Sequence, residues 1–439
     1  MQHLPAILLL FAGAFAHGTL CRTAWGATTT DIPVIQPWRT VALDPEYSGA
    51  WVVAGDLDGD GAVEIVSARN VDRNDVHFTS AVVAQRLDGS VLWRWGDPTI
   101  GRKQLHHDVA CQIYDWDGDG KNEVILATEG FLVELDGATG REKRRLPLPK
   151  DATDCLVFVN LSGKARPTDV LVKTRYTQIW AFDQDWKQLW TIEKPGGYLT
   201  AHQPVAVDLD GDGRDEIMAG FAMLNTDGST RWVFQSRKVD QRRGHCDCFR
   251  LVRAGERPED FRFVITMCGA NGIALIDGNG QPLWELGGEH FESVDVGRIC
   301  AGVDGLQFAV DLDHRPWGDG PVWVIDERGQ VRTKITSDYA RHHSLVDWTG
   351  DGFDEIVIAQ SRSLYDGQGR VVARLAMDAR DDAQGEERLA LTGDFTGDGI
   401  PDVMLTTRAM THVHIYRNER GRRPNPPAPL GTGINFTLY

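Results

Sequence analysis

The stretch DLDGDGAVE at residues 56–64 recurs as DWDGDGKNE at 115–123, DLDGDGRDE at 208–216, DWTGDGFDE at 347–355 and DFTGDGIPD at 394–402. All copies carry acidic residues at positions 1, 5 and 9 and glycine at positions 4 and 6, and three also have Asp at position 3. Carboxylate oxygens are the ligands that Ca²⁺ prefers, and glycine lets a loop fold tightly around an ion. An apolar stretch follows every copy, which is typical of loops that join strands and unlike the helix-flanked EF-hand. The repeat therefore predicts five calcium loops in a β-rich fold.

The acidic side chains of these loops are the predicted calcium ligands. In the first three loops they are Asp56, Asp58, Asp60, Glu64, Asp115, Asp117, Asp119, Glu123, Asp208, Asp210, Asp212 and Glu216, and in the last two Asp347, Asp351, Glu355, Asp394, Asp398 and Asp402. The alternative is an acidic β-turn without an ion, which is favoured most where Thr349 and Thr396 replace the second carboxylate. Because each loop would tie together two strands of one repeat, we expect the Ca²⁺ to be structural.

The spacing of the repeat determines the fold class. A period of about 40–50 residues is typical of propellers and solenoids. Units begin near residues 51, 109, 154, 202, 245, 290, 342 and 389, and three of them lack the acidic loop. In the complete unit, short strands are separated by turns rich in Gly and Asp, which is the pattern of a four-stranded blade. Its strands are WVVAG (51–55), EIVSAR (64–69), AVVAQR (81–86) and VLWRW (91–95).

We therefore predict an all-β chain that forms a single β-propeller of seven or eight four-stranded blades, over residues 51–439. Residues 27–50 are expected to be an N-terminal lead-in. The last blade is expected to close through the Pro-rich link 424–429 into a final strand at 435–439. Tryptophans near strand ends, such as Trp93, Trp190 and Trp284, are expected to pack one blade against the next.

The first 26 residues have the pattern of a signal peptide. The apolar run 4–15 is followed by small residues that suit signal peptidase. The protein is therefore expected to be secreted, either extracellular or periplasmic, and no other segment is apolar enough to span a membrane.

The composition narrows the classes of partner. The formal charge is −17, from 63 acidic and 46 basic residues, and argues against nucleic acid. Seven cysteines are few for a disulfide scaffold, so bridges and buried thiols both remain open. The sequence His245-Cys246-Asp247-Cys248 is only a weak indication of zinc, because no second ligand cluster accompanies it. A monomer is expected.

Basic and titratable residues gather at the other ends of the predicted strands. Inner strands of a propeller begin at the mouth of the central channel. Residues just before them, and residues in the loops between the second and third strands of each blade, should therefore form a rim on the face opposite the acidic loops. Besides other histidines, this rim should hold His77, His107, Arg175, Tyr176, His202 and His245.

Such a rim fits β-elimination from a uronate better than hydrolysis. Glycoside hydrolysis usually needs a pair of carboxylates across the bond, and no obvious pair stands out on this rim, although Asp108, Asp154, Asp247 and Glu289 are nearby. Elimination needs a cation to neutralise the uronate carboxylate, a base for the C5 proton and an acid for the departing O4. Arg can supply the first, and His or Tyr the other two.

The quoted loops resemble those of FG-GAP-type propellers. The segments LHHDVACQIYDWDGDGKNEV (105–124), VLVKTRYTQIWAFD (170–183), AHQPVAVDLDGDGRDEIMAGFAMLNTDG (201–228) and GHCDC (244–248) resemble secreted β-propeller polysaccharide lyases. Similar enzymes act as rhamnogalacturonan lyases, ulvan lyases and rhamnose–glucuronate lyases.

The resemblance implies a role for each rim residue. His77 and His107 are implied as base or acid, and Arg175 as the carboxylate-binding group. Tyr176 is implied in proton transfer or stacking, with His202 and His245 completing the pocket.

We therefore expect a secreted lyase that cleaves an anionic polysaccharide, with rhamnose next to the uronate, by β-elimination. One alternative is an α-L-rhamnosidase on the same fold, which would release free rhamnose. The other is a non-catalytic FG-GAP propeller that binds carbohydrate or mediates adhesion. Titratable groups on the rim argue against the last, because a binding face usually favours aromatic and amide side chains.

Overall fold

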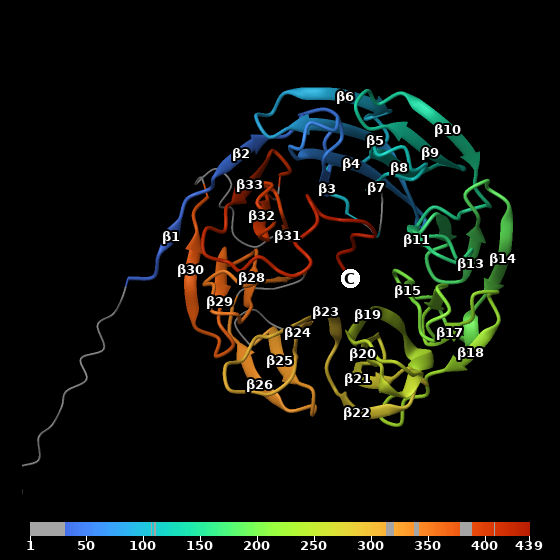
Figure 1. Cartoon of the computed structure of the whole chain (residues 1–439), viewed down its shortest axis with the longest axis vertical. Helices are drawn as coiled ribbons and strands as arrows, with labels where there is room; N and C mark the ends of the chain where they lie inside the picture. Colours follow the sequence, from blue (N-terminus) through green and yellow to red (C-terminus); the bar gives the residue numbers. More distant parts are fainter. Residues whose placement is uncertain are drawn as a thin grey trace, which may run out of the picture. The chain divides into compact units, whose positions relative to one another are not determined.

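Short apolar runs separated by turns fold into antiparallel sheets of four strands. The first blade contains β3 (Trp51–Gly55), β4 (Glu64–Arg73), β5 (Val76–Arg86) and β6 (Val91–Gly96), which pair in chain order. Its innermost strand β3 is buried along its whole length, whereas β6 is partly exposed. The mixed burial of β6 reflects its place at the outer edge of the blade (Figure 1).

The computed structural model describes residues 31–106, 108, 111–312, 320–337, 342–377, 389–407 and 409–439. The chain divides into Met1–Ile32 and a second unit, Pro33–Tyr439, that contains all the strands of the described residues. The predicted signal peptide lies outside the described residues.

Seven more blades follow the first around the ring (Figure 1). Blades two to four contain β7 (Cys111–Tyr114), β8 (Glu123–Thr128), β9 (Phe131–Asp136), β10 (Glu142–Pro147), β11 (Cys155–Val159), β12 (Asp169–Lys173), β13 (Gln178–Phe182), β14 (Gln188–Glu193), β15 (Val205–Val207), β16 (Glu216–Met218), β17 (Ala222–Leu224) and β18 (Thr230–Val233).

Blades five to seven contain β19 (His245–Arg253), β20 (Arg262–Cys268), β21 (Gly272–Asp277), β22 (Pro282–Gly287), β23 (Phe291–Gly297), β24 (Gln307–Leu312), β25 (Val322–Asp326), β26 (Val331–Ile335), β27 (Ser344–Val346), β28 (Glu355–Ile358), β29 (Ser363–Tyr365) and β30 (Val371–Leu375). The eighth contains β31 (Ala390–Gly393), β32 (Asp402–Thr406) and β33 (His412–Tyr416). Three 3₁₀ turns lie at Pro195–Gly197, Gln241–Arg243 and Pro258–Asp260. The predicted β-propeller is confirmed, with eight blades rather than seven.

The ring closes differently from the prediction. The outer strand of the eighth blade is β2 (Arg39–Ala42), which pairs antiparallel with β33, and β1 (Val34–Ile35) adds a parallel strand to β30. The lead-in predicted at 27–50 therefore contributes two strands, and the strand predicted at 435–439 is wrong. Pairing a strand from the start of the chain with strands from its end supplies the fourth strand of the last blade and covers the edge of β33.

With that edge occupied, the segment 431–439 runs into the centre of the ring (Figure 1). The Asn435 side chain brackets the backbone of Phe158 with two hydrogen bonds of 2.8 Å. Gln112 and Gln203 donate to the carbonyls of Phe436 and Asn435 at 3.2 and 3.0 Å. The segment is thus held by residues from three different blades.

Tryptophans of the outer strands join neighbouring blades, as predicted. The indole N–H of Trp93 donates to the Gly137 carbonyl in the next blade at 2.7 Å. Trp190 and Trp284 make equivalent bonds to Thr226 and Glu327 at 3.0 and 2.9 Å. Each bond satisfies a buried indole N–H while the ring fills the space between two blades.

Two further sequence expectations concern cysteines and membranes. None of the six described cysteines forms a disulfide. Among the described residues, no helix has the length and apolar character needed to cross a membrane.

Candidate active site

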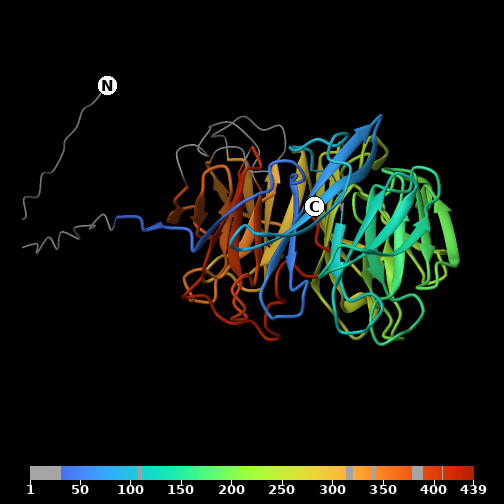
Figure 2. The same cartoon turned by 90° about the horizontal axis from the view of Figure 1, so that it is seen from above.

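The predicted rim residues come from four blades and lie at the ends of strands. His77 stands near the start of β5, and Arg175 and Tyr176 form the turn between β12 and β13. His202 precedes the inner strand β15, and His245 begins the inner strand β19. The acidic loops follow the other ends of the inner strands. The long β4–β5 hairpin, blue in Figure 2, carries His77 away from the loop at residues 56–64.

A buried network surrounds His77. Its Nδ1 lies 2.7 Å from Asp154 Oδ1, and Lys173 Nζ lies 3.1 Å from the other oxygen of that carboxylate. Arg175 Nη1 lies 2.6 Å from His77 Nδ1 and 3.2 Å from its Nε2. The Arg175 side chain is 15% exposed, whereas those of His77 and Asp154 are almost fully buried. Arg175 is therefore the most exposed of these three side chains.

The charges in this network set the protonation of its two carboxyl groups in opposite directions. Burial alone would raise the pKa of Asp154, but the Lys173 ammonium and the His77 hydrogen bond hold it well below its usual value. The second carboxyl group belongs to Asp108, whose Oδ2 lies 3.9 Å from Arg175 Nη1 and whose Oδ1 lies 3.0 Å from His202 Nδ1. Burial and the nearby Asp154 charge raise the pKa of Asp108. The ionised Asp154 can thus orient His77 and Arg175 as a fixed negative charge.

A second group lies on the neighbouring blades. His202 Nε2 and His245 Nε2 are 3.0 Å apart, and Asp247 Oδ1 lies 3.2 and 2.9 Å from them. The Asp247 side chain is fully buried, yet neither carboxylate oxygen makes a hydrogen bond of acceptable geometry. Donor atoms about 3 Å apart match neighbouring ligands on one cation with bonds near 2.1 Å. These three residues therefore fit a divalent cation.

Aromatic rings border this group. The Tyr176 ring centroid lies 4.7 Å from that of His245 and 5.7 Å from that of His202. Tyr439, from the segment in the centre of the ring, stacks on His202 at 4.3 Å with an interplanar angle of 7°. Burial raises the pKa of Tyr176 to about 12, although Arg175 opposes the shift, so its hydroxyl keeps the proton at neutral pH.

Five of the six predicted catalytic residues are brought together in these two groups, and His107 lies outside the described residues. Sequence reasoning assigned no role to Asp108, Asp154, Lys173, Asp247 or Tyr439. Asp247 had a signal in the His-x-Asp pattern at the start of β19, where alternate residues share a face. Lys173 had a similar signal, because it stands two residues before Arg175. Tyr439 had no local signal, because only the path of the last segment brings it to His202.

The acidic loops gather carboxylates where a cation is predicted. Ligand atoms of Asp56, Asp58 and Glu64 lie within 4.8 Å of one another, as do those of Asp115, Asp117 and Glu123. Burial and the neighbouring aspartates raise the pKa of Glu64 to about 7.

Basic side chains contact some of these carboxylates. Lys143 Nζ lies 2.6 Å from Asp117 and 2.7 Å from Glu123, and Arg231 contacts Asp210 and Glu216 at 2.9 and 3.2 Å. A Ca²⁺ ion bound at these two loops would compete with Lys143 and Arg231 for the carboxylates. Calcium binding stays a prediction.

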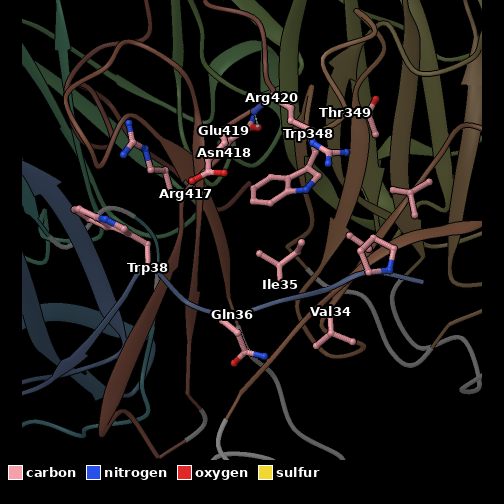
Figure 3. A pocket seen from close by; sticks show the side chains of 13 residues that line it. Val34, Ile35, Gln36, Trp38, Trp348, Thr349, Arg417, Asn418, Glu419 and Arg420 are labelled. Carbon is pink, nitrogen blue, oxygen red and sulfur yellow. Dashed lines mark hydrogen bonds between the residues drawn. The ribbon is translucent and has the colours of Figure 1, made fainter. Parts of the chain in front are cut away.

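Two surface cavities of about 440 Å³ occur in the described residues. One lies beside β1 and is lined by Trp38, Trp348 and Arg417, on the side of an acidic loop (Figure 3). The other is lined by Arg73, Val76, Lys150 and Thr153 among others. Val76 and Thr153 directly precede His77 and Asp154 in the sequence. Only the second adjoins the candidate catalytic residues.

Comparison with known proteins gives a family match over most of the chain. Residues 30–141 and 170–423 match the family described as "Rhamnogalacturonan lyase family 11, C-terminal domain". In Bacillus subtilis (strain 168), rhamnogalacturonan exolyase YesX is 25% identical over 379 residues, covering 70% of this chain and 57% of YesX. Rhamnogalacturonan endolyase YesW is 26% identical over 464 residues, covering 87% of this chain and 71% of YesW. The chain thus spans less than two thirds of the length of YesX.

Solved structures share the fold at lower identity. A Bacillus licheniformis rhamnogalacturonan lyase PL11 superposes with a TM-score of 0.61 at 20% identity, covering 88% of this chain and 75% of that one. The V. cholerae biofilm matrix protein Bap1 superposes with a TM-score of 0.59 at 14% identity, covering 92% and 93%.

Proposed function

This chain belongs to the family of rhamnogalacturonan lyase family 11 C-terminal domains, and from that membership and its rim we propose that it cleaves rhamnogalacturonan by β-elimination. The observation that carries the proposal is the joint placement of Arg175, His77 and Tyr176 at one rim. Arg175 is a permanently charged group with part of its side chain exposed, and Tyr176 retains a proton beside it. A uronate needs both a cation and proton-transfer groups before it can eliminate.

The reaction removes the C5 proton, forms the C4–C5 double bond and breaks the bond from C4 to the leaving O4, which takes up a proton. We assign carboxylate binding to Arg175, because guanidinium can hold a carboxylate with two parallel hydrogen bonds. Asp154 Oδ1 lies 2.7 Å from His77 Nδ1 and orients the ring, and we assign the role of proton acceptor to Nε2, which lies 3.2 Å from Arg175 Nη1. Tyr176, with a pKa of about 12, fits the donor to O4.

His202, His245 and Asp247 would hold a divalent cation on the same rim. When bound, such an ion supplies positive charge that stabilises the developing enolate of the uronate. His107 is the second candidate for the base. The cavity beside His77 is lined by Arg73 and Lys150 together with Glu129 and Asp151, so it offers charged groups of both signs next to the candidate base.

The proposal extends to the setting of the enzyme. The acidic loops are proposed to bind structural Ca²⁺ as in FG-GAP propellers, since their buried glutamates and clustered aspartates repel one another without a cation. The apolar run at 4–15 supports a signal peptide and action outside the cytoplasm on a polysaccharide too large to enter cells. The protein is proposed to act as a monomer.

The test is the ultraviolet absorbance of the 4,5-unsaturated uronate on incubation with rhamnogalacturonan. Ulvan, gum arabic and alginate serve as comparison substrates. His77→Ala and Tyr176→Phe should each abolish the absorbance gain, while the exposed Lys121→Gln should leave it unchanged. Free rhamnose without absorbance would indicate a rhamnosidase, and binding without any product would indicate a carbohydrate-binding propeller; the family match favours neither.

A further inference from the structure

We propose that Asp247, Cys268, His290 and Glu292 form a second metal site, which contains a thiolate and binds an ion of the Zn²⁺ class. The four residues come from three strands of blades five and six. Cys268 ends β20 and faces His245 across the β19–β20 pair. Glu292 lies in β23, and His290 directly precedes that strand. The inner strand β23 packs against β19 and β20, which brings the three strand ends to the same part of the rim.

The donor atoms have the spacing that one small ion requires. Cys268 Sγ lies 3.0 Å from His290 Nε2, which lies 3.1 Å from Glu292 Oε2. One ligand atom from each of the four residues lies within 4.8 Å of every other. Bonds of about 2.3 Å to sulfur and about 2.1 Å to nitrogen or oxygen place tetrahedral ligands roughly 3.4–3.6 Å apart. A shift of a few tenths of an ångström would therefore seat an ion among them.

The buried carboxylates of this group add a second observation. The residues Asp247 and Glu292 are only 2% and 3% exposed. Both oxygens of Asp247 lack a hydrogen bond of acceptable geometry, and removing an ionised carboxylate from water without compensation is unfavourable. Asp247 also has one oxygen near His202 and His245, so its carboxylate can serve both groups. A cation on each side would compensate the buried charge.

The types of donor select the metal. Ca²⁺ takes about six to eight oxygen ligands, whereas a thiolate, an imidazole and carboxylates are typical of Zn²⁺ and similar ions. The five acidic loops offer oxygen alone, so the chain presents two chemically different classes of site. The rim should therefore retain Zn²⁺ in the presence of excess Ca²⁺.

This proposal depends on side-chain geometry and holds whether or not the chain is a lyase. The probe is Co²⁺, added to metal-stripped full-length protein that has first been saturated with Ca²⁺ to fill the loops. Thiolate bound to Co²⁺ produces a charge-transfer band in the near ultraviolet, which oxygen and nitrogen ligands do not. We expect one Co²⁺ ion per chain to give this band. Zn²⁺ should displace that ion and abolish the band, whereas further Ca²⁺ should not.

The matched variants are Cys268→Ser and Cys300→Ser. Cys300 is also a described cysteine without a disulfide, but it lies elsewhere, with its Sγ 3.4 Å from the Gly367 carbonyl. Cys268→Ser should abolish the band, and Cys300→Ser should retain it. If Cys268→Ser fails to fold, His290→Gln replaces it and should weaken Zn²⁺ binding by about tenfold or more. A wild-type protein without a thiolate band, or a band that survives Cys268→Ser, would overturn the proposal.

Discussion

Replacing Asp154 with asparagine should lower the free energy of unfolding by about 3–5 kcal/mol, the typical effect of removing one partner from a buried ion pair. Asp154 and Lys173 are 3% and 1% exposed, and their charged groups lie 3.1 Å apart. The asparagine side chain has nearly the same shape, so no cavity forms. The loss therefore reports the charge that remains on Lys173 together with the altered contact to His77. The other described hydrogen-bond acceptor of Lys173 is the Arg175 carbonyl at 2.6 Å.

The assay is urea unfolding at neutral pH of the wild type, Asp154→Asn, Lys173→Met and the double variant. Replacing both charges by neutral groups of similar size is often nearly neutral, so the double variant should recover to within ~1–2 kcal/mol of wild type. The four proteins form a double-mutant cycle that isolates the interaction of the pair. A loss below ~1 kcal/mol for Asp154→Asn, or simple additivity of the two single effects, would refute this reasoning.

The same pair predicts how the difference between wild type and Asp154→Asn changes with pH. The pKa of Asp154 is well below 3.8 in the folded protein, where Lys173 and His77 favour the ionised form despite burial. The stabilisation by Asp154 is therefore fully present above about pH 4, the value for an unfolded chain. It is lost as the pH falls through the depressed folded pKa. A difference that already shrank between pH 7 and 5 would contradict this sign.

Three other perturbations test the rim and the loops. Arg175→Lys should lower kcat/KM roughly 10- to 150-fold without changing the melting temperature, because it loses charge-assisted hydrogen bonds worth ~1.5–3 kcal/mol. Unchanged kinetics would show that Arg175 does not bind the carboxylate of the substrate. Chelation of Ca²⁺ should lower the melting temperature by several degrees, since Ca²⁺ at 100 times the Kd of a loop adds ~2.7 kcal/mol to the free energy of unfolding. An unchanged melting curve would show that the loops are turns that bind no ion. Lys143→Gln should raise the Ca²⁺ affinity of the loop at 115–123 by a factor of about 1.4 to 5 in calorimetry, because ion pairs of this kind are worth ~0.2–1 kcal/mol. Lys121→Gln, an exposed lysine in the same loop, should have less effect, and equal effects would show that only net charge matters.

The repeat DxDGDGxxE and the turns between apolar runs were sufficient to predict the architecture. Strand period, turn chemistry and loop composition are local properties, so each blade could be recognised from its own residues. The starts of the inner strands were predicted within three residues for all eight units, for example β19 at His245. The same local logic predicted one rim for His202 and His245, which stand at the starts of inner strands, and for Arg175 and Tyr176, which stand in the turn between the second and third strands of their blade. Both positions lie at the same end of a blade, because neighbouring strands are antiparallel.

Pairings between distant residues were decided by the tertiary structure alone. The prediction failed at ring closure, because whether the outer strand of the last blade comes from Arg39–Ala42 or from 435–439 depends on a contact between the two ends of the fold. The same contact frees the last segment to bring Tyr439 against His202. Asp154 and Lys173 became a buried ion pair, and Cys268 a neighbour of His290, only through packing of separate strands. Sequence alone therefore determined which residues stand at the rim, since that follows from strand direction, whereas the structure decided which of them touch, since that follows from how the blades pack.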